Sequence, residues 1–308
     1  MPGPYAHITL LHELMRPARL ESIFSPSTGC HSALQAYFPY CTLGAISPDY
    51  PNLVQGDAQW ADGMHNTRAC EMISNGIRRA RASKGSTRDK QLSWLLGYCA
   101  HVATDVTIHP VVQARVGLYA ENQRQHRVCE MNQDSYIYRR MNLGEIGESD
   151  NFALTVTLCS NPDDVTQLDR DISMLWEGML ADVYPELFFE NLPESTLWHR
   201  QFVTRMAKCC AGALKLFPLA DLIAEKMKLA YPLYDMVEKQ FIEHQLVPSE
   251  KPHHLHYDDI FDRAVGNVAV VWKLVELAFD DDDPAYQPSF GDWNLDDGCD
   301  EYGRLVFW

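Results

Sequence analysis

The sequence lacks any uninterrupted apolar run that approaches 18 residues, and it has no excess of positive charge. The first absence argues against a transmembrane helix, which needs about 20 consecutive apolar residues. The second argues against nucleic acid as a partner, because a formal net charge of −16 repels phosphate backbones and anionic lipid surfaces. Bound metal cations would reverse the local field around a site, so a small anionic substrate stays possible.

The sequence also lacks the usual patterns of a secreted protein. Its first residues, MPGPYAHITLLHELMRPARL, do not combine a basic start, an apolar core and a small-residue cleavage site, so no signal peptide is predicted. Nine cysteines are scattered along the chain without a C-x-x-C pair, which fits buried, reduced thiols better than a disulfide framework. Together these features predict a cytoplasmic location.

Alternating strand patterns are scarce, whereas apolar residues recur at helical spacing along most of the chain. One such helix is predicted from Ser86 to about His109, where Pro110 should limit or kink it. The same period appears in 60–83, 118–142, 165–184, 199–217, 219–230 and 258–279, and an ambiguous run lies at Phe152–Leu158. The sequence therefore predicts an all-α protein, with a multi-helix domain over residues 1–280 and an acidic, Pro/Gly-rich tail over 281–308 packed on it.

The strongest chemical signal is GYCAHVATDVTIH over residues 97–109. It places His101, Asp105 and His109 four residues apart, so that they follow one helix face with a drift of about 40° per step. Their neighbours are apolar, so the stripe should point into the interior. A buried Asp between two His needs a partner, because burying an unpaired carboxylate costs several kcal/mol or shifts its pKa strongly.

A second stripe follows in HRVCEMNQD, where His126, Glu130 and Asp134 again recur every four residues. One such stripe could be an ordinary capped or solvated helix face. Two in consecutive helices can face each other and present ligands across a gap, as in the metal sites of helical bundles. The mixture of His and carboxylate suits zinc, with manganese or iron as less favoured substitutes.

Three weaker candidates lie upstream of the two stripes. Asp49 stands in the Pro-flanked turn GAISPDYP, where an Asp is commonly a turn residue or a helix cap. His65 lies in WADGMH and His7 in PYAHITLL, and either one alone would usually be structural.

Taken in order, His7, GAISPD, His65, GYCAHVATDVTIHP and HRVCE resemble the zinc-dependent phospholipase C family over roughly residues 4–138. That family includes the N-terminal domain of glycosylphosphatidylinositol-specific phospholipase D, and single-strand-specific nucleases share its fold more distantly. The resemblance implies a phospholipase C/nuclease-type helical bundle whose core holds a metal cluster that hydrolyses phosphoesters. Residues 139–308 carry no motif that extends it.

The resemblance also implies how two or three zinc ions would be held. Asp49, His65, His101 and Asp105 would hold one ion, His109, His126 and Glu130 a second, and His7 and Asp105 a third, with Asp105 bridging. In secreted bacterial members an N-terminal Trp completes the third site. This chain begins Met1-Pro2-Gly3, so a water, His12 or a ligand from the unmatched half would have to replace it.

These observations lead to the hypothesis of a zinc-dependent, phospholipase C-like phosphodiesterase. A metal-activated water would attack phosphorus, with Asp49 as ligand or general base, and the substrate would be a phosphoester or lipid-like small molecule. One alternative keeps the metal site but acts on a soluble small molecule of a biosynthetic pathway. Another is a non-catalytic helical scaffold that the metals stabilise.

Three segments of the unmatched half stay open. His253, His254 and His256 are interpreted as a solvated loop, or else as a group that completes the third metal site or contacts phosphate. Asp292–Gly298 resembles a calcium loop, but its Gly falls one place late and no Glu stands at the twelfth position, so an acidic turn is predicted. Met206–Val237 should form two core helices, or a lid for a lipid-like substrate.

Overall fold

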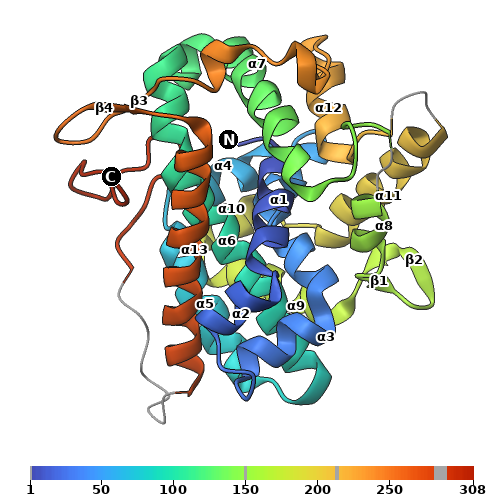
Figure 1. Ribbon diagram of the computed structural model, residues 1–308. Coiled ribbons are helices and arrows are strands. Elements are labelled where there is room, and N and C mark those ends of the chain that lie inside the picture. Colours follow the sequence, from blue (N-terminus) through green and yellow to red (C-terminus); the bar gives the residue numbers. More distant parts are fainter. Residues whose placement is uncertain (1, 149–150, 212–214, 281–289) are drawn as a thin grey trace.

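The computed structural model, which describes residues 2–148, 151–211, 215–280 and 290–308, confirms the all-α prediction (Figure 1). The helices are α1 Pro4–Leu14, α2 Pro17–Ile23, α3 Gly29–Gly44, α4 Ala58–Asn66, α5 Ala69–Ala82, α6 Gly85–Val116, α7 Tyr119–Tyr138, α8 Asn151–Thr157, α9 Arg170–Val183, α10 Pro185–Glu190, α11 Ser195–Ala211, α12 Pro218–Met227 and α13 Tyr257–Asp280, with 3-10 turns η1 Ser47–Leu53, η2 Arg139–Met141, η3 Tyr234–Met236 and η4 Lys239–Phe241. Two small antiparallel hairpins pair β1 Ser160–Asn161 with β2 Asp164–Leu168 and β3 Gln245–Val247 with β4 His253–Leu255. Among these residues, no helix is long and apolar enough to cross a bilayer.

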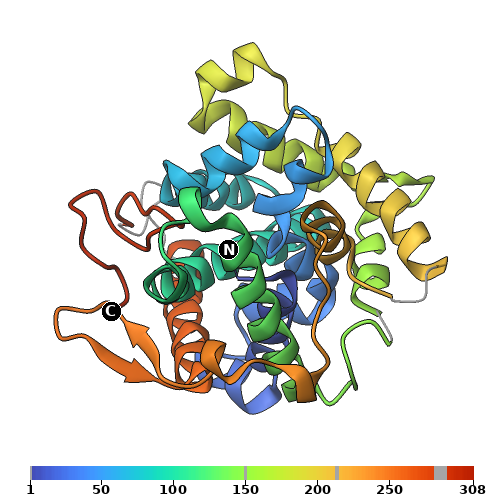
Figure 2. The same cartoon turned by 90° about the horizontal axis from the view of Figure 1, so that it is seen from above.

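Helix α6 is the centre of the bundle, where α3, α5, α7 and α13 pack around it (Figures 1 and 2). Every residue from Gln91 to Val112 is buried, which is the behaviour of a helix enclosed on all sides rather than an amphipathic surface helix. Two glycines let α3 approach closely. A Cβ at Gly44 would lie 2.0 Å from the Trp94 carbonyl oxygen, and one at Gly97 would lie 2.0 Å from the Cys41 carbonyl oxygen.

Of the two expectations for Pro110, the one that it ends the helix is wrong, because α6 continues through it to Val116. Proline has no N–H, so the Val106 carbonyl one turn earlier loses its usual helical donor. Residue Gly298, far along the chain, packs against this point, where a Cβ would lie 2.6 Å from the Val106 carbonyl oxygen. A tertiary contact therefore covers the defect that the local sequence suggested would end the helix.

Three other element boundaries differ from the sequence prediction. The predicted helix 60–83 is two helices, because Arg68 adopts a left-handed φ of 55° between α4 and α5. The predicted helix 165–184 begins as strand β2, and α9 starts only after Asp169, whose side chain caps it by accepting from the Asp171 amide. The ambiguous run Phe152–Leu158 falls mostly in helix α8.

The segment Met206–Val237 includes the end of α11 and the whole of α12, while residues 212–214 within it lie outside the described residues. Of the predicted tail, residues 281–289 also lie outside them. Residues 290–308 lie against the bundle, where the Trp308 indole donates to the Thr107 carbonyl of α6 at 2.8 Å.

Helix α1 begins with Gly3 and has no capping side chain of its own. The cap comes from Asp134 of α7, whose Oδ1 accepts from the Ala6 amide at 2.7 Å. The Tyr231 hydroxyl donates to the other oxygen of Asp134 at 3.1 Å. The last member of the second polar stripe thus has a structural role, and it fixes the start of the helix that carries His7.

We predict that Asp134→Ala lowers the free energy of unfolding by about 1–2 kcal/mol, because the first turn of α1 loses its acceptor. Asp134→Asn should lower it less, since an amide oxygen can still accept from the Ala6 N–H. Chemical denaturation followed by circular dichroism measures both changes. An Ala variant as stable as the wild type would contradict the capping role.

Candidate metal centre

Five of the residues predicted to hold metal meet in the middle of the bundle. His7 comes from α1, Asp49 from η1, His65 from the last turn of α4, and His101 and Asp105 from α6. None of them is more than 9% exposed. His7, His101 and Asp105 present ligand atoms within 4.8 Å of one another, and so do Asp49, His65 and His101. The structure therefore brings one candidate ligand set together from four separate elements.

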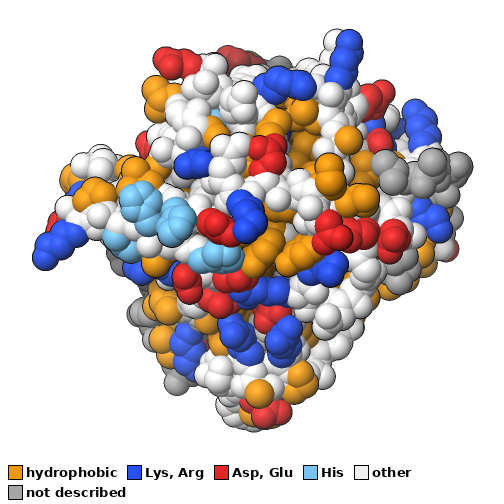
Figure 3. Space-filling view, turned by 45° about the horizontal axis from the view of Figure 1, so that its top comes forward, with side chains coloured by type: hydrophobic (Ala, Val, Ile, Leu, Met, Phe, Trp, Pro, Cys, Tyr) orange, Lys and Arg blue, Asp and Glu red, His pale blue; other side chains and the backbone are white. Residues whose placement is uncertain are grey.

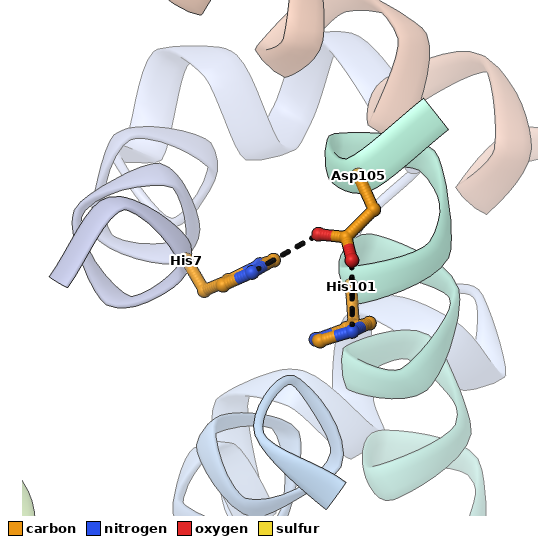
Figure 4. Close-up of side chains that lie close together, drawn as sticks. All are labelled: His7, His101 and Asp105. Atoms are coloured by element: carbon orange, nitrogen blue, oxygen red, sulfur yellow. Dashed lines mark ion pairs between the residues drawn. The ribbon is translucent and has the colours of Figure 1, made fainter. Parts of the chain in front are cut away.

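Asp105 lies between the histidines, and its two oxygens face in different directions (Figure 4). Its Oδ1 lies 3.2 Å from His7 Nε2, while its Oδ2 lies 3.3 Å from His101 Nε2. The Oδ2 atom is also 3.7 Å from His65 Nε2, on the side where Asp49 Oδ1 approaches the same imidazole at 3.8 Å. Asp105 can therefore contribute one oxygen on the side of His7 and the other on the side of His101 and His65.

Main-chain carbonyls orient three of the predicted histidines through Nδ1. The pairs are His65 with Ala61 at 2.7 Å, His101 with Ala45 at 2.9 Å, and His109 with Leu295 at 2.5 Å. A carbonyl oxygen can only accept, so Nδ1 carries the proton in each case and Nε2 of the neutral ring presents a lone pair. Hydrogen bonds of this kind orient histidines that bind metal in other proteins.

The arrangement leaves acceptors facing acceptors. The Nε2 atoms of His65 and His101 lie 3.1 Å apart, although in the neutral rings neither has a proton to donate. Several buried ligand atoms also lack a hydrogen-bond partner: both nitrogens of His7, Oδ1 of Asp49, both oxygens of Asp105 and Nε2 of His109. Unpaired buried polar groups are costly, and a bound cation would satisfy this set. Two nitrogens on one tetrahedral zinc lie about 3.3 Å apart, given bonds of ~2.0–2.1 Å, so the residues fit the ion.

The electrostatics of the cluster favour a negative Asp105. Burial acts to raise the pKa of Asp105, but the His101 and His109 imidazoles hold it well below its usual value. Burial in turn opposes charge on His101, and Asp105 overcomes it and raises the His101 pKa. Burial and the neighbouring His101 lower the pKa of His7. Asp105 therefore favours protonation of His101 when no cation is bound, and metal binding has to compete with that proton.

The ligand atoms of the second predicted set lie farther from one another than those of the first. This set consists of His109, His126 and Glu130. Within the described ranges, no group of three ligand atoms within 4.8 Å includes any of them. His126 donates from Nε2 to the Gly117 carbonyl at 2.6 Å, which leaves its Nδ1 3.9 Å from Glu130 Oε1. These two side chains face each other, whereas His109 stands apart from them.

The other histidines considered from the sequence lie away from the cluster. His12 packs edge-on against Phe38, with ring centroids 5.5 Å apart. His253 and His254 are exposed on strand β4, and His256 follows it with Nδ1 3.2 Å from Asp258 Oδ2. Figure 3 shows exposed histidines gathered at one edge of the molecule. In the part of the chain that the structure describes, none of the four joins a group able to hold a metal.

A cavity of about 230 Å³ opens beside the cluster. Two of the candidate ligands, Asp49 and His65, line this cavity. Arg127, Tyr119 and Asp296 line it as well. Helix α12 also lines the cavity, with the mostly apolar residues Leu219, Leu222, Ile223 and Met227 and with Lys226. The cavity therefore joins the metal-binding groups to both a cationic and an apolar surface.

Sequence reasoning missed Arg127, although it stands inside the HRVCE motif. The side chain is 7% exposed, donates to Glu130 Oε2 at 2.8 Å and to the Tyr119 hydroxyl at 3.1 Å, and reaches the cavity wall. Burial opposes its charge, but Glu130 raises the pKa of Arg127 above its ordinary value. The sequence did contain one indication of its role, because Arg127 stands between His126 and Glu130, two predicted metal ligands.

Sequence reasoning also missed Leu295, in the segment predicted to be an acidic turn. Its carbonyl accepts from His109 Nδ1, and its amide donates to the His65 carbonyl at 2.8 Å. Both contacts use main-chain atoms, which have no side-chain signature, so no residue pattern could have revealed them.

We predict that Asp105→Asn lowers bound zinc, because the amide keeps the shape but removes the charge that compensates a cation. Zinc is measured by elemental analysis after equilibration at one fixed free-zinc concentration. Asp163→Asn, on the exposed turn between β1 and β2, is the control for a lost surface charge and should retain the wild-type zinc content. Wild-type zinc content in Asp105→Asn would mean that the stripe on α6 is a structural polar seam.

Comparison with known proteins agrees with the ligand pattern. Residues 6–186 match the family model described as zinc-dependent phospholipase C. The match extends beyond the two polar stripes to α9, and it covers more than half of the 308 residues. No curated protein and no solved structure gives a significant match. The chain belongs to the zinc-dependent phospholipase C family.

Proposed function

We propose that this protein is a zinc-dependent hydrolase of phosphoester bonds that acts in the manner of a phospholipase C. The observation that carries the proposal is a buried group of His and Asp ligand atoms without hydrogen-bond partners, next to a cavity with a buried arginine. The metal-binding groups alone would suit many reactions. The guanidinium beside them favours a phosphate group, because its fork of donors matches phosphate oxygens.

We assign one zinc ion to Asp49, His65, His101 and Asp105. The first three present ligand atoms within 4.8 Å of one another, and Asp105 Oδ2 lies 3.3 Å from His101 Nε2 and 3.7 Å from His65 Nε2. Asp105 would also bridge to an ion at His7, since its second oxygen faces that imidazole at 3.2 Å. His109, His126 and Glu130 remain the proposed ligands of a further ion, and their side chains would have to move closer on binding. Manganese or iron could substitute in the same His and carboxylate sites.

When bound, zinc supplies a Lewis acid and lowers the pKa of a coordinated water towards about 7. The chain's own residues then divide the remaining work. Arg127 binds non-bridging oxygens of the phosphoester in the cavity. Asp49, at the junction of cavity and cluster, orients the attacking water and accepts its proton as the new P–O bond forms. When the ester P–O bond breaks, the departing alkoxide oxygen takes up a proton from Asp49 or from solvent water and leaves as an alcohol.

The cavity also bears on the class of substrate. A space of about 230 Å³ accommodates a phosphorylated head group, and the α12 residues at its rim offer an apolar surface for what is attached to it. A phospholipid whose chains stay outside the cavity fits this description, and so does a small soluble phosphoester with an apolar group. The net charge of −16 disfavours nucleic acid. A cavity that reaches the ligands is characteristic of a catalytic metal site rather than a closed structural one.

The direct test is hydrolysis by the zinc-loaded protein of three substrates: phosphatidylcholine in mixed micelles, a small aromatic phosphodiester and a small phosphomonoester. Phosphodiester cleavage that disappears with a chelator and returns with zinc supports the proposal. Hydrolysis of the phosphatidylcholine alone would indicate a lipid substrate, and hydrolysis of the aromatic diester alone a soluble one. A protein that carries zinc but cleaves none of the three would contradict the proposal and favour a metal-stabilised scaffold.

We predict that Asp49→Asn lowers kcat by about 10²-fold or more, while bound zinc falls much less than in Asp105→Asn. The reason is position, since Asp49 lies at the edge of the cluster and Asp105 at its centre. Turnover and zinc stoichiometry should be measured on the same samples. Equal loss of zinc in the two variants would assign Asp49 to metal binding alone.

We predict that Arg127→Lys lowers kcat/KM by about 10-fold or more and weakens inhibition by inorganic phosphate, with zinc content retained. A lysine keeps the charge beside Glu130 but cannot present two donors to a phosphate. Arg78→Lys, at an exposed arginine of α5 that pairs with Asp182, is the control for an arginine-to-lysine change away from the cavity. Unchanged kcat/KM and unchanged phosphate inhibition in Arg127→Lys would exclude a role in substrate binding.

A further inference from the structure

The last described part of the chain, residues 290–308, lies beyond the family match and reaches the candidate metal centre. We call it the C-terminal segment. It runs beside α13 and α6 (Figure 1). Leu295 donates its amide to the His65 carbonyl at 2.8 Å and accepts from His109 Nδ1 at 2.5 Å. One residue of this segment is thus bonded to two proposed ligand residues that come from different helices.

The C-terminal segment is held at this point by a specific fit to α6. Pro110 leaves the Val106 carbonyl without its helical donor, and Gly298 packs directly over that turn. A Cβ on Gly298 would lie 2.6 Å from the Val106 carbonyl oxygen and 2.3 Å from Pro110 Cγ. Gly298 also has a φ of +70°, which side chains rarely adopt. Only glycine satisfies both conditions without displacing the segment.

The turn that presents Leu295 is itself well bonded. Asn294 Oδ1 accepts from the Asp296 amide at 2.8 Å and from the Asp297 amide at 3.3 Å, and the Asn294 carbonyl accepts from the Gly298 amide at 2.9 Å. The Leu295 side chain is fully buried. The same turn places Asp296 on the cavity wall, with its Oδ1 3.9 Å from His109 Nδ1. These contacts hold the Leu295 main chain and the Asp296 side chain in place beside the candidate metal centre.

We propose that the C-terminal segment is a positioning element of the metal centre. The Leu295 carbonyl holds His109 in the Nδ1–H tautomer, so that Nε2 is directed to metal, and the Leu295 amide ties the His65 turn to α6. Leu295 is therefore a positioning residue and not a ligand. The inference rests on the proposed metal-dependent function, and it adds to that function a part of the chain which the family match does not cover.

Two glycines of the segment provide a matched test. Gly298→Ala should push the segment off α6, whereas Gly303→Ala carries the same backbone strain, with φ +74°, but meets nothing within 4 Å. Zinc affinity, measured by competition with a chelating dye, should fall about 10- to 100-fold in Gly298→Ala, the range found when partners of metal-bound histidines are removed. It should stay within about twofold of the wild type in Gly303→Ala.

A second pair of variants covers the case in which Gly298→Ala does not fold. Asn294→Ala removes the acceptor that holds the turn, and Asn294→Asp keeps one. Asn294→Ala should weaken zinc binding, and Asn294→Asp should retain it. A merely structural role would lower stability in Asn294→Ala without a change in zinc affinity at temperatures where the variant is folded.

A measurement without metal separates this inference from the proposed function. In the metal-free protein with ¹⁵N-labelled histidine, NMR should show His109 as the Nδ1–H tautomer in the wild type and as a tautomer mixture in Gly298→Ala. If the wild type binds no zinc, the proposed function fails while this tautomer test still decides the inference. An Nε2–H tautomer in the wild type, or equal zinc affinity and equal tautomers in Gly298→Ala and Gly303→Ala, would overturn it.

Discussion

The carboxylate of Asp105 has no solvent exposure, and neither of its oxygens has a hydrogen-bond partner. A bare charge in such surroundings would be strongly unfavourable, so everything near it has to compensate. Three imidazoles surround it, and two of them use their Nδ1 protons elsewhere, on the carbonyls of Ala45 and Ala61. What remains at the centre is a set of nitrogen and oxygen ligand atoms around one negative charge. The fold is therefore suited to binding a cation beside Asp105.

That requirement explains several features that look unrelated. The glycine contacts between α3 and α6 bring the Ala45 carbonyl within 2.9 Å of His101 Nδ1. The Asp134 cap fixes the start of α1 and with it His7, and the Leu295 main chain connects the His65 turn to His109. Each contact reduces the freedom of a proposed ligand before any metal is bound. Preorganisation of this kind raises metal affinity, because fewer side chains have to be ordered on binding.

The sequence predicted the helical class, and it placed His101 and Asp105 on one helix face for a physical reason, whereas only the family resemblance suggested that His7, Asp49 and His65 would join them. Residues four apart on a helix share a face whatever the tertiary structure, and a polar stripe among apolar neighbours has few explanations. The sequence was a poor guide to contacts whose partner is distant along the chain or is a main-chain atom. At Pro110, through which α6 continues, the helix is in contact with Gly298, 188 positions later, and three histidines are oriented by carbonyl groups. Arg127 was visible in the sequence, but only burial distinguishes it from a solvated arginine.

The central claim is that the acceptors around Asp105 hold a zinc ion. Anomalous diffraction on either side of the zinc absorption edge, from crystals of the zinc-loaded protein, tests it most directly. We expect an anomalous peak bounded by Asp49, His65, His101 and Asp105, present above the edge and lost below it. Full zinc occupancy elsewhere on the molecule, with hydrogen-bonded water or no density among these four side chains, would contradict it.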